Sequence, residues 1–168
     1  RTVRQMIERG IHAPISHGAG RYFDAVGALL LGHSETTWEG PVAQQLGELA
    51  DPRERGLYSF EIDRSAATWQ MDLRPALRRL TQEHLRHKSV PVLAARFHNT
   101  LAAAATTTLG ELMARLGPRP VVLSGGCFAN PLLTRRIVDG LAASTLVYRH
   151  QEVPPGDGGL ALGQILAA

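Results

Sequence analysis

The chain has little of three residue types that mark particular classes of protein. Its 168 residues include one cysteine, Cys127, so no internal disulfide can form and no cysteine cluster can hold a structural zinc. Lys88 is the only lysine, and aromatic residues make up 5%. Surfaces that bind nucleic acids usually combine a dense basic stripe with aromatic platforms. We therefore expect no nucleic-acid partner, although the net charge of +3 is positive.

Long apolar runs are also missing. The longest stretches, at residues 25–31 and 101–105, are far short of the roughly 20 residues that span a bilayer. The first residues do not have the pattern of a signal peptide. We therefore expect no membrane association and a cytoplasmic location. The remaining composition, 44% hydrophobic and 20% charged, is typical of a globular chain with one core.

Hydrophobic spacing and turn residues divide most of the chain into helices and short strands. Alternating apolar residues, with a turn cluster between them, predict a β-hairpin from residues 57–62 and 67–71. Apolar residues at helical spacing, bounded by capping residues, glycine and proline, predict helices over 20–31, 42–50, 73–84, 90–116, 132–141 and from 160 onward. The alanine-rich middle of the longest helix predicts close packing against a sheet.

The C-terminal third predicts a parallel strand pair. Buried-strand patterns at residues 120–124 and 145–148 flank the helix over 132–141. A strand, a helix and a second strand in so short a segment form a right-handed βαβ unit with parallel strands. The chain is therefore expected to have an α/β fold.

The loop over residues 124–130 joins the first of these strands to its helix. In open α/β sheets, ligands collect beyond the carboxyl ends of the strands, where glycines allow close approach of backbone to a phosphate. Gly125 and Gly126 lie at such a place, and Asn130 with Pro131 predicts a helix cap. The spacing matches neither a Walker loop nor a dinucleotide fingerprint. A binding loop and a turn without ligand both remain open.

Two carboxylates stand beside glycines or apolar residues. Asp157 lies on a loop with two prolines before it, where its side chain either caps the last helix or binds a divalent cation. Asp24 follows Tyr22 and Phe23 within the first predicted helix. A carboxylate near a packed face is costly unless it is paired. It is thus either ion-paired to an arginine or facing a ligand.

Five ordered motifs resemble one known family. They are GRYFDAV at 20–26, WEG at 38–40, RFH at 96–98, SGGCFAN at 124–130 and VPPGDGGLALGQ at 153–164. In this order they resemble the HypF-type carbamoyltransferases, which mature [NiFe]-hydrogenases. The resemblance covers residues 1–168 and implies the C-terminal part of the carbamoyltransferase domain, which is related to the tRNA threonylcarbamoyl transferases. It implies an actin/Hsp70-like lobe in which helices pack on a mixed sheet.

The resemblance also implies an activity and a site. Members of this family use ATP and carbamoyl phosphate to form a carbamoyl-adenylate. They then carbamoylate the C-terminal cysteine of a HypE-type partner, on the route to the cyanide ligands of the hydrogenase iron. Asp157 would bind Mg²⁺ or another divalent metal, and Asp24 would contact the ribose. The full set of nucleotide-binding positions implied by the motifs is Asp24, Glu39, Gly40, Gly125, Gly126 and Asn130.

The chain departs from the family pattern near its beginning. Ser16-His17 stands where many relatives have two serines, and the family's histidine-rich motif, which supplies the other metal ligands, is not found. We therefore expect an incomplete part of a longer enzyme, inactive by itself. The alternatives are a related carbamoyltransferase that acts on a small molecule or tRNA, and a non-catalytic nucleotide-binding module.

Two residues with reactive side chains are assigned to packing. His98, on the long helix beside Phe97, is expected to be a core histidine rather than a catalytic base. Cys127 is expected to be a small packed residue, because the accepting thiolate of this chemistry belongs to the partner.

Overall fold

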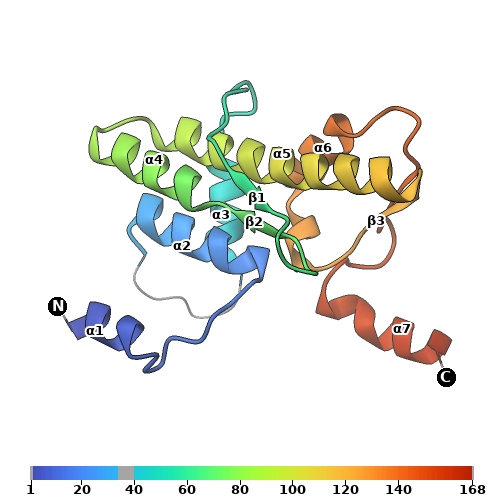
Figure 1. The fold of residues 1–168 in the computed structure, drawn as a ribbon, viewed down its shortest axis with the longest axis horizontal. Coiled ribbons are helices and arrows are strands. Elements are labelled where there is room, and N and C mark those ends of the chain that lie inside the picture. Colours follow the sequence, from blue (N-terminus) through green and yellow to red (C-terminus); the bar gives the residue numbers. More distant parts are fainter. Residues whose placement is uncertain (1, 34–39, 168) are drawn as a thin grey trace.

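One long helix organises the molecule. The computed structural model describes residues 2–33 and 40–167 (Figure 1). The helix α5 (Val90–Leu116) is about 40 Å long at the usual rise per residue. Four helices pack on it: α2 (Ala19–Leu31), α3 (Pro41–Leu49), α4 (Arg74–Leu85) and α6 (Pro131–Gly140). Since α5 contacts all of them, it fixes the positions of segments far apart in the sequence.

The helix boundaries follow local capping signals. Gly32, in the left-handed region at φ 72°, donates its N–H to Ala28 and ends α2. Pro91 lies in the first turn of α5 and Gly117 follows its last residue. Asn130 caps α6, and Pro131 takes its first position. The predicted bounds of these helices are confirmed to within one residue.

The core is built from the buried faces of these helices. The largest side chains with almost no exposure are Phe23, Leu46, Leu73, Leu80, Leu93 and Phe97. Small residues bring helices close together: a Cβ at Gly140 on α6 would lie 3.1 Å from the Thr106 methyl carbon on α5. The partners of α5 are mainly helices, with β1 also in contact. The packing against a sheet that its alanine-rich middle predicted is thus largely replaced by helix-to-helix packing, which small side chains serve equally well.

The strands are three residues long and form two pairs. β1 (Glu61–Asp63) and β2 (Gln70–Asp72) form the predicted antiparallel hairpin. β3 (Val121–Leu123) and β4 (Val147–Arg149) are parallel and joined through α6, which confirms the βαβ unit and the α/β class. Within the described part of the chain the two pairs are separate two-stranded sheets rather than one mixed sheet. The hairpin residues are mostly exposed.

A buried carboxylate on α4 ties three segments together. Glu83 is 8% exposed and accepts hydrogen bonds from the Tyr58 hydroxyl, Arg79 Nε and Arg96 Nη1 at 3.1, 3.1 and 3.2 Å. Lys88 Nζ lies 3.4 Å from the same carboxylate. Burial opposes ionisation, but these donors and cations outweigh it and lower the pKa of Glu83. The charge of Glu83 therefore helps to hold α4 against α5.

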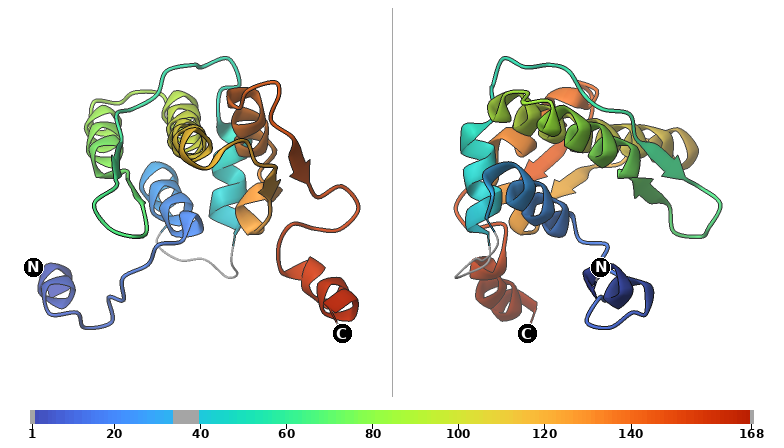
Figure 2. Two further views of the ribbon diagram at one scale, coloured as in Figure 1. Left: turned by 45° about the vertical axis from the view of Figure 1, so that its right-hand side comes forward. Right: turned by 90° about the vertical axis from the view of Figure 1, so that its left-hand side faces the viewer.

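The two terminal helices extend away from the core. α1 (Thr2–Glu8) and α7 (Leu160–Ala167) have no buried residue, and they project at opposite ends of the molecule (Figures 1 and 2). Their apolar side chains are open to solvent; Ile7 is 64% and Leu166 is 79% exposed. Among the described residues, no helix combines the length and the hydropathy needed to cross a bilayer.

Candidate functional site

The glycine loop, residues 124–130, presents an open backbone surface directly after β3. Gly125 has φ 105° and ψ 157°, a conformation that side chains disfavour. Its N–H donates a 2.7 Å hydrogen bond to the Pro155 carbonyl. Gly126 then begins the 3₁₀ turn η1 (Gly126–Ala129). A Cβ built on either glycine would meet no atom within 4 Å, so the space before both is unfilled by the described chain.

A second loop, residues 153–159, supports the first one. A Cβ at Gly156 would lie 3.4 Å from the Cα of Gly126, so the two backbones are in close contact. The next residue, Asp157, begins the 3₁₀ turn η2 (Asp157–Gly159) with an exposed side chain. The structure therefore brings together Gly125, Gly126 and the segment that carries Asp157, although about 30 residues separate them in sequence.

Asp157 is not a helix cap. Gly156 occupies the capping position of η2, and the Asp157 carboxylate has no hydrogen bond or ion pair among the described residues, so it caps neither η2 nor α7. The neighbouring glycines are required by the turn itself: a Cβ at Gly159 would lie 2.7 Å from the Pro154 carbonyl oxygen. Gly159 therefore serves the packing of the turn, in which the chain folds back on itself.

The described residues do not form a complete metal site. They contain no group of three or more His, Cys, Asp or Glu side chains placed to hold one ion. A divalent cation in proteins usually takes several oxygen ligands. Asp157 could supply one such oxygen, and the other ligands would have to come from outside the described chain.

The first turn of α2 lies against the glycine loop. A Cβ at Gly20 would lie 3.9 Å from the Cys127 sulfur. Further along this turn, Arg21 Nη2 lies 3.0 Å from Asp24 Oδ2, so the ion-paired alternative for Asp24 is observed. Burial and the nearby charge of Asp24 raise the pKa of the Cys127 thiol. The thiol is thus a half-buried, protonated packing group, as expected.

Asn130 closes the glycine loop and is turned inward. Its Oδ1 accepts hydrogen bonds from the N–H groups of Leu132 and Leu133, both at 3.1 Å. Its Nδ2 lies 2.8 Å from Nε2 of His98 on α5. A Cβ at Gly47 on α3 would lie 2.9 Å from the same Nδ2, so only glycine fits there. Both polar ends of Asn130 are therefore used within the protein.

His98 is a fully buried core histidine, as predicted. It has no exposed surface, and its Nδ1 lies 2.7 Å from the Ala94 carbonyl oxygen. Burial is the main cause that lowers the pKa of His98, and the charge of Arg136 adds to it, while the hydrogen bond to Ala94 acts in the opposite direction. No sequence signal predicts the contact between His98 and Asn130, which are 32 positions apart.

The remaining predicted site residues precede α3. Gly40 is the residue before that helix and has φ 100°, a value that favours glycine. Glu39 lies outside the described residues. The structure thus places Gly40 at a helix start and does not test its contact with a nucleoside.

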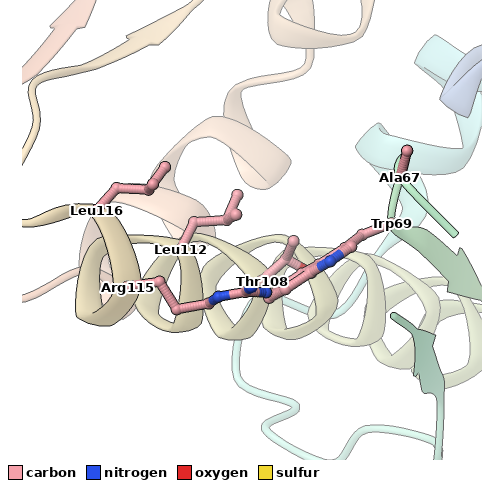
Figure 3. Close-up of a pocket in the computed structure, with 6 residues that line it drawn as sticks. All are labelled: Ala67, Trp69, Thr108, Leu112, Arg115 and Leu116. Atoms are coloured by element: carbon pink, nitrogen blue, oxygen red, sulfur yellow. The ribbon is translucent and has the colours of Figure 1, made fainter. Parts of the chain in front are cut away.

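A separate hollow lies between the hairpin and the end of α5 (Figure 3). It has a volume of about 410 Å³ and is lined by Ala67, Trp69, Thr108, Leu112, Arg115 and Leu116. The guanidinium carbons of Arg64 and Arg115 lie 5.6 and 5.1 Å from the centre of the Trp69 ring. None of the predicted site residues lines this hollow.

Comparison with known proteins identifies the family. The family model described as "Carbamoyltransferase, Kae1-like Domain, second subdomain" matches residues 1–164. The chain belongs to the HypF carbamoyltransferase family. It is 33% identical to carbamoyltransferase HypF2 of Cupriavidus necator, over 99% of this chain and 23% of that protein. Carbamoyltransferase HypF of a Synechocystis species is 30% identical over 99% of this chain and 21% of that protein.

Solved HypF structures share the fold. A crystal structure of full-length HypF in the phosphate- and nucleotide-bound form matches 97% of this chain and 22% of its own, with a TM-score of 0.89 and 31% identity. The structure of T. kodakarensis HypF gives a TM-score of 0.81 and 27% identity over 99% of this chain and 21% of its own. The chain thus spans about a fifth of the length of these HypF proteins.

Proposed function

We propose that this chain forms the C-terminal part of the carbamoyltransferase domain of a HypF-type enzyme and that its glycine loop binds the nucleotide. The observation that carries the proposal is the open backbone surface of Gly125 and Gly126 at the carboxyl end of a parallel strand. Ligands of α/β folds bind at such strand ends. A full-length HypF that shares this fold is known in a phosphate- and nucleotide-bound form, which supports nucleotide binding by a protein of this family.

The proposed reaction uses ATP and carbamoyl phosphate to form a carbamoyl-adenylate. Water cleaves carbamoyl phosphate to carbamate and phosphate. A carbamate oxygen then bonds to the α-phosphorus of ATP, and pyrophosphate leaves with the electron pair of the broken bond. In the transfer step, the thiolate sulfur of the C-terminal cysteine of a HypE-type partner bonds to the carbamoyl carbon. The bond from that carbon to the phosphate oxygen of AMP breaks, and AMP leaves with the electron pair. The role of this chain is to hold the adenylate. The backbone of Gly125 and Gly126 would contact its phosphate, because the two glycines leave room for a close approach.

Asp24 is proposed to accept hydrogen bonds from the ribose hydroxyls. Its ion-pair partner, Arg21, lies about one turn earlier on α2, and the pair is partly exposed. Such pairs contribute only about 0.3–0.5 kcal/mol to stability. The pair therefore orients the carboxylate without committing both of its oxygens. Glu39 and Gly40 are proposed to contact the nucleoside from the start of α3. Asn130 is proposed to act on the nucleotide only through the loop that it closes.

Asp157 is proposed as one ligand of Mg²⁺ or another divalent metal in the full-length protein. Its carboxylate is exposed and stands beside the glycine loop, through the contact of Gly156 with Gly126. When bound, such an ion neutralises phosphate charge. The chain itself supplies the carboxylate and holds it on a turn that Pro154 and Gly159 keep compact.

The test is a glycine replacement in the full-length protein. Gly126→Val should retain the fold, because the described chain leaves space for the side chain, but should weaken ATP binding at least tenfold by filling the proposed phosphate site. Gly110→Val, on an exposed position of α5 with equal free space, is the matched control and should bind ATP as the parent does. Isothermal titration gives both affinities. An unchanged affinity for Gly126→Val would mean that the loop is only a turn.

A further inference from the structure

We infer that His98 is a positioning residue for the glycine loop and that it acts through the side-chain amide of Asn130. The inference rests on the proposed nucleotide site, because the loop is the element that His98 would hold in place. His98 is fully buried, so it cannot touch a nucleotide itself. Its effect must pass through the residues that it contacts.

The hydrogen bonds of His98 fix its tautomer. The Ala94 carbonyl oxygen can only accept a hydrogen bond, so Nδ1, 2.7 Å away, must carry the proton. In a neutral imidazole the other nitrogen is then an acceptor. Nε2 therefore accepts a hydrogen bond from the Asn130 amide nitrogen, 2.8 Å away. Burial favours this neutral form and lowers the pKa of His98.

The acceptor on His98 in turn fixes the orientation of the Asn130 amide. With its NH₂ group toward Nε2, Asn130 directs Oδ1 at the N–H groups of Leu132 and Leu133. In the opposite orientation, the NH₂ group of Asn130 would point at two N–H donors, and its amide oxygen would point at the lone pair of His98 Nε2. Neither contact could be a hydrogen bond. His98 thus selects the orientation in which Asn130 caps α6.

Asn130, which caps α6, is also the last residue of the glycine loop. The Asn130 N–H donates to the Cys127 carbonyl at 3.2 Å, and the Phe128 N–H donates to the Gly125 carbonyl at 3.0 Å. The Thr134 hydroxyl, one turn into α6, donates to the Phe128 carbonyl at 3.1 Å. A change at Asn130 therefore reaches the two proposed phosphate-binding glycines through consecutive backbone hydrogen bonds.

The surroundings leave His98 and Asn130 little freedom. The His98 ring packs edge-on against Phe23 and Phe97, with centroid distances of 5.1 and 6.0 Å. Gly47 closes the space beside the Asn130 amide nitrogen. The arrangement is therefore rigid: Phe23 of α2 packs on the His98 ring, and α3 and α5 contact the Asn130 side chain.

Two amide replacements at His98 in the full-length protein separate positioning from packing. Glutamine places its amide where Nε2 lies and can accept from Asn130, whereas asparagine reaches only the position of Nδ1. We expect His98→Gln to keep ATP affinity within about threefold and His98→Asn to lose at least tenfold. Amide hydrogen exchange should become faster at 126–130 and at Leu132 and Leu133 in His98→Asn and stay near the parent rate in His98→Gln.

Two further variants complete the experiment. The first tests whether a general loss of stability changes ATP affinity, and the second removes the amide donor of Asn130. Leu80→Ala removes a fully buried side chain from α4 and should lower stability while leaving ATP affinity and exchange of the glycine loop unchanged. Asn130→Asp keeps a capping oxygen but has no amide donor for His98, so it should behave as His98→Asn does.

Equal loss of affinity in His98→Gln and His98→Asn would overturn the inference, as would unchanged loop exchange in both His98→Asn and Asn130→Asp. If the parent protein fails to bind ATP, the proposed function fails instead. The exchange rates of the His98 and Asn130 variants would still decide whether His98 positions the loop.

Discussion

Replacing Glu83 by glutamine removes a buried charge while keeping the shape of the side chain. The Tyr58 hydroxyl can still donate a hydrogen bond to the amide oxygen of glutamine. The interactions that are lost are therefore those of the carboxylate with the cationic side chains. Arg96, whose side chain is 24% exposed, is the least exposed of the three cations, so water screens its interaction with Glu83 least. Arg79 and Lys88 are 54% and 35% exposed, so water screens their contributions. Allowing about 1.5 kcal/mol for Arg96 and less than 1 kcal/mol for each of the others gives a destabilisation of about 2–3 kcal/mol.

Thermal and denaturant unfolding measure this loss. For a chain of this length, about 2–3 kcal/mol corresponds to a fall of roughly 5–10 °C in Tm. Glu111→Gln is the matched control, because it removes a carboxylate whose pair with Arg64 is exposed on both sides. It should lower Tm much less than Glu83→Gln does, because water screens an exposed ion pair.

The pH dependence gives the same prediction a second test. The pKa of Glu83 is lowered in the folded protein from its ordinary value of 4.5. Its contribution to stability is therefore complete above pH 4.5 and is lost as the pH falls through the folded pKa. Glu83→Gln should lose stability less steeply than the parent in this acidic range. Equal Tm values and equal acid profiles for the two proteins would refute the role assigned to Glu83.

Three further predictions concern the proposed function. The chain alone should fold but should not form carbamoyl-adenylate from ATP and carbamoyl phosphate, since it spans about a fifth of the HypF proteins; product formation by the purified chain would contradict this. Cys127→Ala in the full-length enzyme should leave carbamoyl transfer largely intact, and a thousandfold fall, about 4 kcal/mol, would make the thiol a nucleophile. Asp157→Asn should keep the fold but lower both bound divalent metal and transfer rate by well over tenfold; full metal content and activity would exclude the ligand role.

Local signals explain what the sequence predicted well. The bounds of α5 follow from Pro91 at its start and Gly117 after its end, and the cap of α6 follows from Asn130 and Pro131. Each of these signals acts on backbone groups within one turn of the residue that carries it. Such features can be predicted without knowing what lies across the core.

Contacts between distant segments explain what the sequence did not predict. The pairing of His98 with Asn130 depends on how α5 lies beside α6, and no spacing rule relates the two residues. The contact that requires glycine at position 159 could not be predicted, because Pro154, whose carbonyl oxygen a Cβ there would strike, comes near only once the loop has folded back. The mixed sheet was implied by the family resemblance, whereas the strand patterns of the sequence do not specify which strands pair.

The uneven burial along the chain has a consequence for handling the protein. The middle of α5 is buried from Leu93 to Ala104, whereas α1 and α7 bury nothing. Segments with few buried contacts open at little cost in free energy, while a buried central helix opens only with the whole domain. A protease added under native conditions should therefore trim both ends first and leave a resistant product centred on α5.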